Sequence, residues 1–381
     1  MSEKFFYGEV VPLPDARFSR ADRIWQGVPT IECTAGGRLY AAWYSGGSTE
    51  PSLYNYIIIA RSDDGGITWR EITAVNGDAE RRMQMVDPQF WTAPNGQLWC
   101  FLVKRDWNVG PKDQRHLSTA VMICDNPDAT ELVFSEPKFV CQGFVRNRPL
   151  ILADGRWLLP AYRFAGERCA YFESTDQGAS FQLREAGKKL ETDYDETMFF
   201  QRQDGILVLW YRVNPKYGRI AQCLSHDGGQ SWNDSELTDI PNQQTRFYIS
   251  RLPSGRLLLI NNFDAKERVN LRICLSEDDG KSWPYQLLLD GRDDVSYPDV
   301  SLAPDGALYI IHDRARPIAK EILCSRIYEE EIIAGKLSRP QSYQNNIVSK
   351  GPASPVSGNE YLRKFQEFDT AFSKEYWHRK W

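Results

Sequence analysis

The residues best suited to chemistry in this sequence are arginines, carboxylates and aromatic residues that recur at the ends of predicted strands. Arginine is favoured over lysine at these positions, and its planar guanidinium group presents a fork of donors that matches a carboxylate. Together with the neighbouring rings, this pattern predicts a site for an anionic ligand, and for an acidic sugar in particular. The candidates are Trp43, Asp87, Arg105, Arg146, Arg148, Glu196, Arg212, Arg246, Arg268, Tyr297 and Asp299.

Other catalytic signatures are absent from the sequence. It contains no Walker loop and no GxSxG, HExxH or GxGxxG motif. Of its four histidines, His226 lies inside a turn motif and His378 lies near the C-terminus. Only His116 and His312 remain to support a histidine-centred mechanism, which makes that interpretation weak. The eight cysteines include no CxxC pair and no Cys/His cluster with zinc spacing, so we expect no metal and no cofactor.

The elements that must position the candidate residues follow from an internal repeat. A motif of the form Ser-x-Asp-x-Gly-x-Thr/Ser-aromatic begins at Ser62, Ser174, Ser225 and Ser276. A second marker, a turn that ends in glycine before an apolar strand, occurs six times at intervals of about 50–60 residues. Each interval accommodates four short strands. We therefore expect an all-β fold, a six-bladed β-propeller.

The repeated Ser/Asp motif has a structural explanation. Its aspartate can accept backbone N–H groups across a tight turn, and its glycine tolerates a positive φ. The aromatic residue that follows can pack on a neighbouring blade. We therefore expect the motif aspartates to stabilise turns and to have no catalytic role. They are Asp64, Asp176, Asp227 and Asp278.

The two ends of the chain are predicted separately. We assign residues 1–345 to the propeller and expect residues 5–12 to supply the outer strand of the last blade, which would remove open sheet edges. Residues 346–381 are predicted to be a linker and an amphipathic C-terminal helix. That helix is expected to pack on the propeller, and an oligomer contact or a lid over the pocket are the alternatives. Its aromatic stripe is Tyr361, Phe365, Phe368, Phe372 and Tyr376.

The overall composition limits the classes of partner. The formal net charge is −5, which argues against a nucleic-acid binder. No apolar run approaches the roughly 18–20 residues of a membrane span. The first residues lack the pattern of a signal peptide, so we expect a cytoplasmic protein without a membrane partner.

The repeated motifs resemble the Asp boxes of sialidases, and six units match the six-bladed sialidase propeller over roughly residues 20–345. The resemblance implies a retaining exo-glycosidase that releases sialic acid or a related acidic sugar, with a tyrosine nucleophile in place of the usual second carboxylate. Tyr297 matches the nucleophile and Glu196 the base that takes its proton. Arg212 and Arg268 match two arginines that clamp the carboxylate of the sugar.

The sequence departs from the sialidase pattern at two places. Gly27-Val28-Pro29 stands where the family has Arg-Ile-Pro, so the first arginine of the family is missing. The loop 45–52 lacks the acid/base aspartate of the family, and Glu50 is its only carboxylate. Glu50 is therefore our candidate acid. Arg146, Arg148 or Arg105 could supply the missing cation.

Three functions stay open at this point. The first is an exo-acting, retaining glycosidase of sialidase type that acts on an acidic glycan. The second is a hydrolase or lyase for uronic-acid glycans on the same propeller, and a lyase would leave an unsaturated product. The third is a carbohydrate-binding propeller without catalysis, which the missing arginine would favour.

Overall fold

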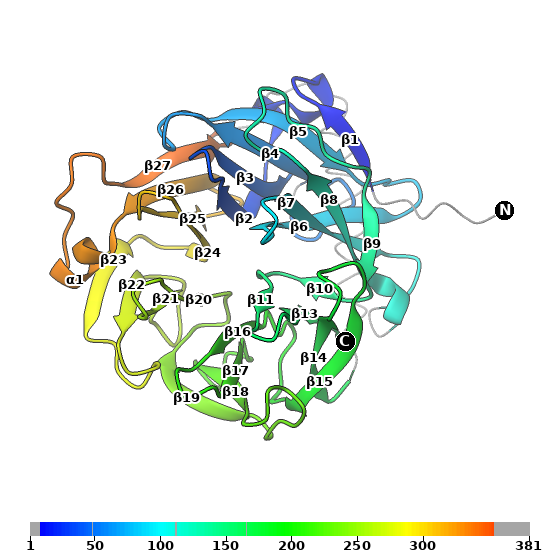
Figure 1. Ribbon diagram of the computed structural model, residues 1–381. Coiled ribbons are helices and arrows are strands. Elements are labelled where there is room, and N and C mark those ends of the chain that lie inside the picture. The colour runs from blue at the N-terminus through cyan, green and yellow to red at the C-terminus, as the bar shows by residue number, and fades with distance from the viewer. Residues whose placement is uncertain (1–7, 48, 111–112, 165, 354–381) are drawn as a thin grey trace. The chain divides into compact units, whose positions relative to one another are not determined.

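The computed structural model describes residues 8–353 apart from residues 48, 111–112 and 165 (Figure 1). The regular secondary structure of the described chain is nearly all strand and forms the six-bladed β-propeller that the repeat predicts. It divides into two compact units. Within the described residues, unit one comprises 8–142, 313–323 and 347–353, and unit two comprises 143–312 and 324–346.

Unit one contains the first two sheets. The first sheet has the order β1-β5-β4-β3-β2, and the second has β6-β7-β8-β9. Short 3-10 helices flank these strands: η1 (Ala16–Phe18), η2 (Arg20–Asp22) and η3 (Gln114–His116). The strands are β1 (Glu9–Pro12), β2 (Gln26–Cys33), β3 (Leu39–Ser45), β4 (Tyr56–Ser62), β5 (Arg70–Asn76), β6 (Met83–Thr92), β7 (Leu98–Asp106), β8 (Leu117–Cys124) and β9 (Lys138–Cys141).

The third, fourth and fifth blades lie in unit two. Strands β10 and β13 form a short pair beside the sheet β11-β12-β14-β15, and the next two sheets keep simple chain order. The strands are β10 (Phe144–Val145), β11 (Leu150–Ile151), β12 (Trp157–Leu159), β13 (Ala161–Tyr162), β14 (Arg168–Ser174), β15 (Gln182–Lys188), β16 (Met198–Gln201), β17 (Leu207–Tyr211), β18 (Arg219–Ser225), β19 (Glu236–Pro241), β20 (Tyr248–Arg251), β21 (Leu257–Asn261), β22 (Leu271–Ser276) and β23 (Tyr285–Asp290).

The sixth sheet has the order β24-β25-β26-β27. The strands are β24 (Val295–Leu302), β25 (Leu308–Arg314), β26 (Glu321–Ile327) and β27 (Tyr343–Lys350), with α1 (Glu329–Ala334) between the last two. The sequence did not predict this six-residue helix, which Glu331 caps by accepting a hydrogen bond from the backbone N–H of Tyr328 at 2.9 Å. Gly335 ends the helix in the left-handed conformation, with a φ of 67°.

The four Ser/Asp motifs form turns with one shared hydrogen-bonding pattern. In the first, Asp64 accepts from the backbone N–H of Thr68 at 2.9 Å and from its hydroxyl at 2.6 Å. The motifs of Asp176, Asp227 and Asp278 repeat both bonds with a serine. These contacts use the carboxylate oxygens within the turn, as the structural interpretation predicts.

The aromatic residue of the motif also has the expected role. Trp232 lies edge-on to the ring of Tyr171 in the preceding blade, with 6.0 Å between ring centroids. It contacts Phe199 at the same separation. Edge-to-face packing of this kind contributes about 0.5–1.5 kcal/mol beyond the burial of the rings. The contact of Trp232 with Tyr171 therefore stabilises the packing of two neighbouring blades.

The N-terminal strand differs from our expectation. Strand β1 pairs antiparallel with β5 and extends the first blade, whereas β27 is the outer strand of the last blade. The open edge of β5 accepts β1 in this register, and Val11 is the one buried residue of that strand. The boundary that we placed at residues 345/346 falls inside β27. The predicted C-terminal helix lies outside the described residues.

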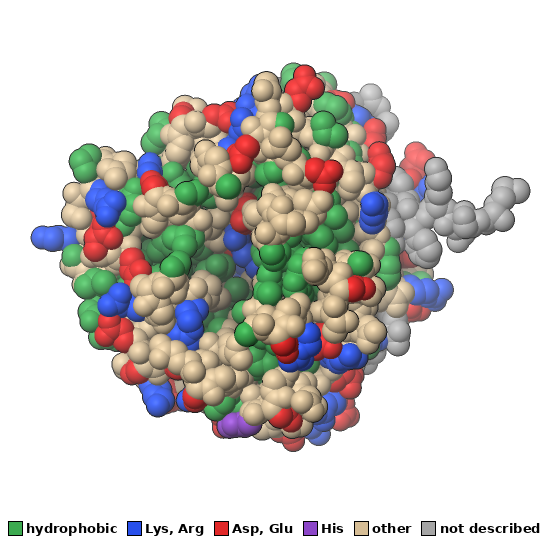
Figure 2. Space-filling view, in the orientation of Figure 1, with side chains coloured by type: hydrophobic (Ala, Val, Ile, Leu, Met, Phe, Trp, Pro, Cys, Tyr) green, Lys and Arg blue, Asp and Glu red, His purple; other side chains and the backbone are tan. Residues whose placement is uncertain are grey.

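Two further observations concern the surface. Acidic and basic side chains are interspersed over the face shown in Figure 2, without a large area of one sign. No helix in the described ranges is long and apolar enough to cross a membrane.

Candidate active site

The centre of the candidate site is a hydrogen-bonded pair in unit two, formed by Tyr297 and Glu196. Tyr297 lies in β24, and Glu196 lies two residues before β16. The Oη of Tyr297 donates to Oε1 of Glu196 at 2.6 Å. Both residues are buried, with exposures of 3% and 0%. Both also have a positive φ, 56° and 45°, which is uncommon outside glycine and is often found at functional sites.

Two arginines complete the surroundings of Glu196. Nη1 of Arg212, which directly follows β17, donates to Oε2 of Glu196 at 2.9 Å and to Oη of Tyr297 at 2.8 Å. Nη1 of Arg146, which directly follows β10, lies 3.1 Å from Oε1 of Glu196. The guanidinium group of Arg146 also lies 5.4 Å from the centroid of the Tyr297 ring. Each carboxylate oxygen therefore faces a cation.

The charges in this cluster determine the protonation of Glu196. Burial by itself would raise the pKa of Glu196, but the positive charges of Arg212 and Arg146 and the Tyr297 hydrogen bond lower it to about 2. Conversely, burial would lower the pKa of Arg212, and the charges of Glu196 and Tyr297 raise it above its ordinary value. Glu196 is thus a carboxylate at neutral pH and can accept a proton.

Arg246 and Asn147 hold the backbone around the pair. Arg246 donates to the carbonyl of Arg146 at 2.8 Å and to those of Tyr297 and Pro298 at 3.2 and 3.1 Å. Asn147 donates to the carbonyls of Glu196 and Thr197 at 3.3 and 2.7 Å. The sequence assigns Arg246 to substrate binding, whereas these donors bind backbone carbonyls. Asn147 is not among the sequence candidates, although it adjoins Arg146.

The partly exposed side of the cluster carries further arginines. Arg268 donates to Oγ of Ser296 at 3.4 Å, and its guanidinium group lies 5.5 Å from the Tyr297 ring centroid. Arg148 pairs with Asp299 at 3.3 Å. Arg212 lies 5.1 Å from the ring centroid of Tyr194. Arg148, Arg268 and Tyr194 are partly exposed, so this is the side on which residues of the cluster meet solvent.

An ion pair beside the cluster is formed by Lys189 and Asp195, which are not among the sequence candidates. Asp195 is buried and forms an ion pair with Lys189 at 3.1 Å. Burial raises the pKa of Asp195, although Lys189 opposes the shift. The backbone carbonyl of Asp195 also accepts from the backbone N–H of Arg212 at 2.8 Å. The ion pair therefore holds in place the segment that carries Glu196. In the sequence, the only sign of this role is that Asp195 directly precedes Glu196.

The candidate acid, Glu50, lies in unit one. Oε2 of Glu50 accepts from Nη1 of Arg316 at 2.8 Å, and Nε of Arg316 donates to Asp313 at 2.9 Å. Asp313 also accepts from the backbone N–H of Val28 at 2.7 Å. A Cβ atom at Gly27 would lie 2.7 Å from Cδ of Arg316. Arg316 thus fills the space beside Gly27. The sequence analysis does not predict this role, and Arg316 is not among its candidates.

The other unit-one candidates lack an exposed surface for a sugar. Trp43 is fully buried, and its indole N–H donates to Gln26 at 3.2 Å. Arg105 is buried and lies 5.6 Å from the ring centroid of Trp107. Asp87 is also buried and has a φ of 49°. Among the described residues, no group of three or more His, Cys, Asp or Glu side chains is placed to hold a metal ion.

The sequence of this propeller matches the model of a known family. Residues 37–310 match the model of a family described as BNR repeat-like domain. The chain belongs to this family. The match covers most of the BNR repeat-like chain, and it agrees with the repeats read from the sequence. Among curated proteins, none is similar enough in sequence to match.

Solved structures show which fold this BNR repeat-like protein shares. An intramolecular trans-sialidase from Ruminococcus gnavus matches with 15% identity and a TM-score of 0.64, over 83% of this chain and 96% of that one. A leech intramolecular trans-sialidase matches with 14% identity and a TM-score of 0.66, over 86% and 71%. The Hadza microbial sialidase Hz136 matches with 18% identity and a TM-score of 0.61, over 75% of this chain. The present chain spans 63% of the length of Hz136. At these identities, the likeness establishes a sialidase-like fold.

Proposed function

We propose that this protein is a sialidase-like exo-glycoside hydrolase that releases a terminal acidic sugar, sialic acid or a relative, with retention of configuration. The observation that carries the proposal is the buried pair of Tyr297 and Glu196, joined at 2.6 Å and surrounded by arginines. A phenol next to an ionised carboxylate is an activated nucleophile. The arginines suit an anionic substrate.

The first chemical step forms a covalent intermediate. Oη of Tyr297 attacks the anomeric carbon, and the bond between that carbon and the leaving-group oxygen breaks. The phenol proton passes to Oε1 of Glu196. The leaving oxygen takes a proton from an acid, and Glu50 stays the predicted acid. Because the nucleophile Tyr297 is a neutral phenol, no negatively charged carboxylate has to attack the anionic sugar.

The second step returns the enzyme to its starting state. Water attacks the anomeric carbon, and the bond from that carbon to Oη of Tyr297 breaks. Glu196 returns its proton to Oη, and the conjugate base of the acid takes a proton from the water. Two displacements at one carbon leave the configuration of the released sugar unchanged.

The arginines contribute in two ways. The pKa of Glu196 is about 2, whereas the ordinary pKa of a phenol is about 10. Because of this difference, Glu196 is a weak base for removing the proton of Tyr297. Arg212 reduces this difference, because its donation to Oη at 2.8 Å favours the phenolate. When the carboxylate of a bound sugar takes up part of the arginine charge, the basicity of Glu196 rises. Substrate binding would therefore activate the pair.

The named ligands of the structural relatives support an acidic sugar. The Ruminococcus gnavus enzyme is a complex with oseltamivir carboxylate, and the leech enzyme is a complex with 2,7-anhydro-Neu5Ac. Both ligands carry a carboxylate. Arg212, Arg268 and Arg148 are the residues of unit two that we propose bind the corresponding group.

A substrate panel tests the proposal. The full-length protein is incubated with aryl glycosides and acidic oligosaccharides, sialosides included, and the released sugars are identified by mass spectrometry. We expect release of a terminal acidic sugar by the parent protein and none by Tyr297→Phe, whose circular dichroism spectrum should show that the fold is retained. An unsaturated product would indicate a lyase. Glycan binding without release of any sugar would refute hydrolysis.

A further inference from the structure

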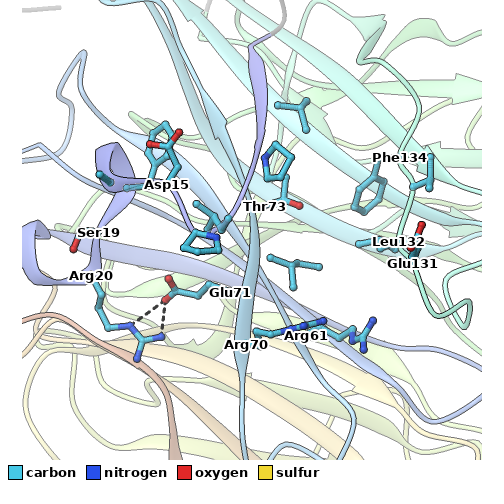
Figure 3. Close-up of a pocket in the computed structure, with 18 of the residues that line it drawn as sticks. Asp15, Ser19, Arg20, Arg61, Arg70, Glu71, Thr73, Glu131, Leu132 and Phe134 are labelled. Carbon is cyan, nitrogen blue, oxygen red and sulfur yellow. Dashed lines mark hydrogen bonds and ion pairs between the residues drawn. The ribbon is translucent and has the colours of Figure 1, made fainter.

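Unit one contains a groove with a volume of about 1030 Å³. Apolar side chains from β1, β5 and residues 130–134 form much of its lining. In Figure 3, Leu132 and Phe134 lie on one side of the groove, and Arg20 and Glu71 lie on the other. The groove plays no part in the proposed hydrolysis.

Three of the charged residues that line the groove, Arg20, Arg61 and Glu71, already have partners. Arg20 pairs with Glu71 at 2.9 Å. Arg61 pairs with Asp63 at 2.8 Å and donates to the carbonyl of Thr130 at 3.2 Å. The apolar lining, by contrast, includes Val133, which is 70% exposed. An apolar patch within a polar rim is typical of a surface that binds a partner.

The described chain ends beside this groove. The hydroxyl of Ser349 lies 3.3 Å from Oε1 of Glu71, a residue that lines the groove. Three residues later, Lys320 donates to the carbonyl of Pro352 at 2.9 Å and fixes the end of the described residues on unit one. Ser349 therefore lies next to one side of the groove, and the described chain continues for four residues from there.

The following residues have the pattern of an apolar helix face. In 361–376, aromatic residues recur at steps of 4, 3, 4 and 4, which places them on one side of a helix. Charged residues such as Lys364 and Glu367 fall between them. A helix of this span is about 24 Å long at 1.5 Å per residue. The seven residues 354–360 can extend about 23 Å, which is enough to start that helix at the groove.

We infer that residues 361–376 dock as an amphipathic helix, with their aromatic stripe in this groove of the same chain. Tethering favours the segment of the same chain over a second copy, because a site joined to its ligand by a short stretch of chain meets it at an effective concentration on the order of millimolar. Burial of the stripe removes both its own rings and the apolar lining of the groove from water.

Photo-crosslinking from the groove tests this inference on the full-length protein. Val133→Cys places a thiol at the rim for a benzophenone maleimide, and the eight native cysteines are buried. Ile318→Cys is the matched control, because Ile318 is 73% exposed and lies in unit one. Lys320 Nζ donates to the carbonyls of both Ile318 and Pro352. A tail that only diffuses over the surface would therefore meet Ile318 at least as readily.

We expect crosslinks from Val133→Cys to map to residues 361–376 of the same chain, several-fold more often than those from Ile318→Cys. Phe368→Asp, in the stripe, should abolish them, and Thr370→Asp, on the opposite side of the predicted helix, should not. Crosslinked dimers would overturn the inference in favour of a second copy. Crosslinks to residues 1–7, equal yields from both positions, or no crosslinks at all would also overturn it.

Discussion

Replacement of Glu196 by glutamine should remove a defined part of the pH dependence of stability. The pKa of Glu196 falls from its ordinary value of 4.5 to about 2 in the folded protein. At about 1.36 kcal/mol per pKa unit, the ionised form stabilises the fold by about 3 kcal/mol at neutral pH. Because the folded pKa is the lower one, this stability is complete above pH 4.5 and is lost as the pH falls toward 2.

The glutamine variant cannot ionise and leaves Arg212 and Arg146 buried without their carboxylate. Breaking a buried pair in this way costs about 3–5 kcal/mol. We therefore expect Glu196→Gln to be clearly less stable than the parent at pH 7, and the difference to shrink by about 2 kcal/mol at pH 3. Urea unfolding followed by tryptophan fluorescence, at several pH values from 7 to 3, measures both free energies of unfolding.

A control and a contrary result make this test decisive. Glu167→Gln alters a carboxylate whose side chain is 83% exposed, and its stability should follow that of the parent at every pH. If the difference between Glu196→Gln and the parent stays constant from pH 7 to pH 3, the carboxylate is not held ionised by the arginines. The assignment of Glu196 as an ionised base would then be wrong.

The remaining predictions concern residues that position the site or the blades. Asn147→Ala removes both hydrogen bonds to the Glu196 segment and should lower kcat about ten-fold with little change in KM, measured on the substrate found in the panel. Gly27→Ala places a Cβ against Arg316 and should lower the free energy of unfolding by about 1–3 kcal/mol. An unchanged urea midpoint would show that Arg316 does not pack against Gly27. Asp278→Ala removes three turn hydrogen bonds and should cost about 1–2 kcal/mol of stability without changing KM. A loss of substrate binding would contradict a purely structural role.

The sequence predicts the architecture well because the repeat is periodic. A turn glycine in each of six units, and a Ser/Asp motif in four of them, indicate the number of blades and their order along the chain. The sequence also brings Tyr297, Glu196 and Arg212 forward as partners, and the structure joins them by hydrogen bonds of 2.6 to 2.9 Å. Local patterns that repeat, or that a family shares, are therefore sufficient for this part.

Other features depend on tertiary contacts that no local pattern encodes. The four residues of β1 can pair with any open edge, and the edge of β5 accepts them. The side chain of Arg246 is of a type that binds anionic ligands, but its guanidinium group donates to the backbone carbonyls of Arg146 and Tyr297. Arg316 becomes important only because Gly27 leaves space for it. In each case the partner lies far away in the sequence.

The most direct test of the central proposal is to identify the residue that binds the sugar covalently. An activated acidic sugar with fluorine beside the anomeric centre slows the second step, so that the intermediate accumulates for peptide mapping by mass spectrometry. We predict one sugar attached to the peptide that contains Tyr297, and no label in Tyr297→Phe. A label on Glu196 or another carboxylate, or consumption of the reagent without any label, would contradict the mechanism.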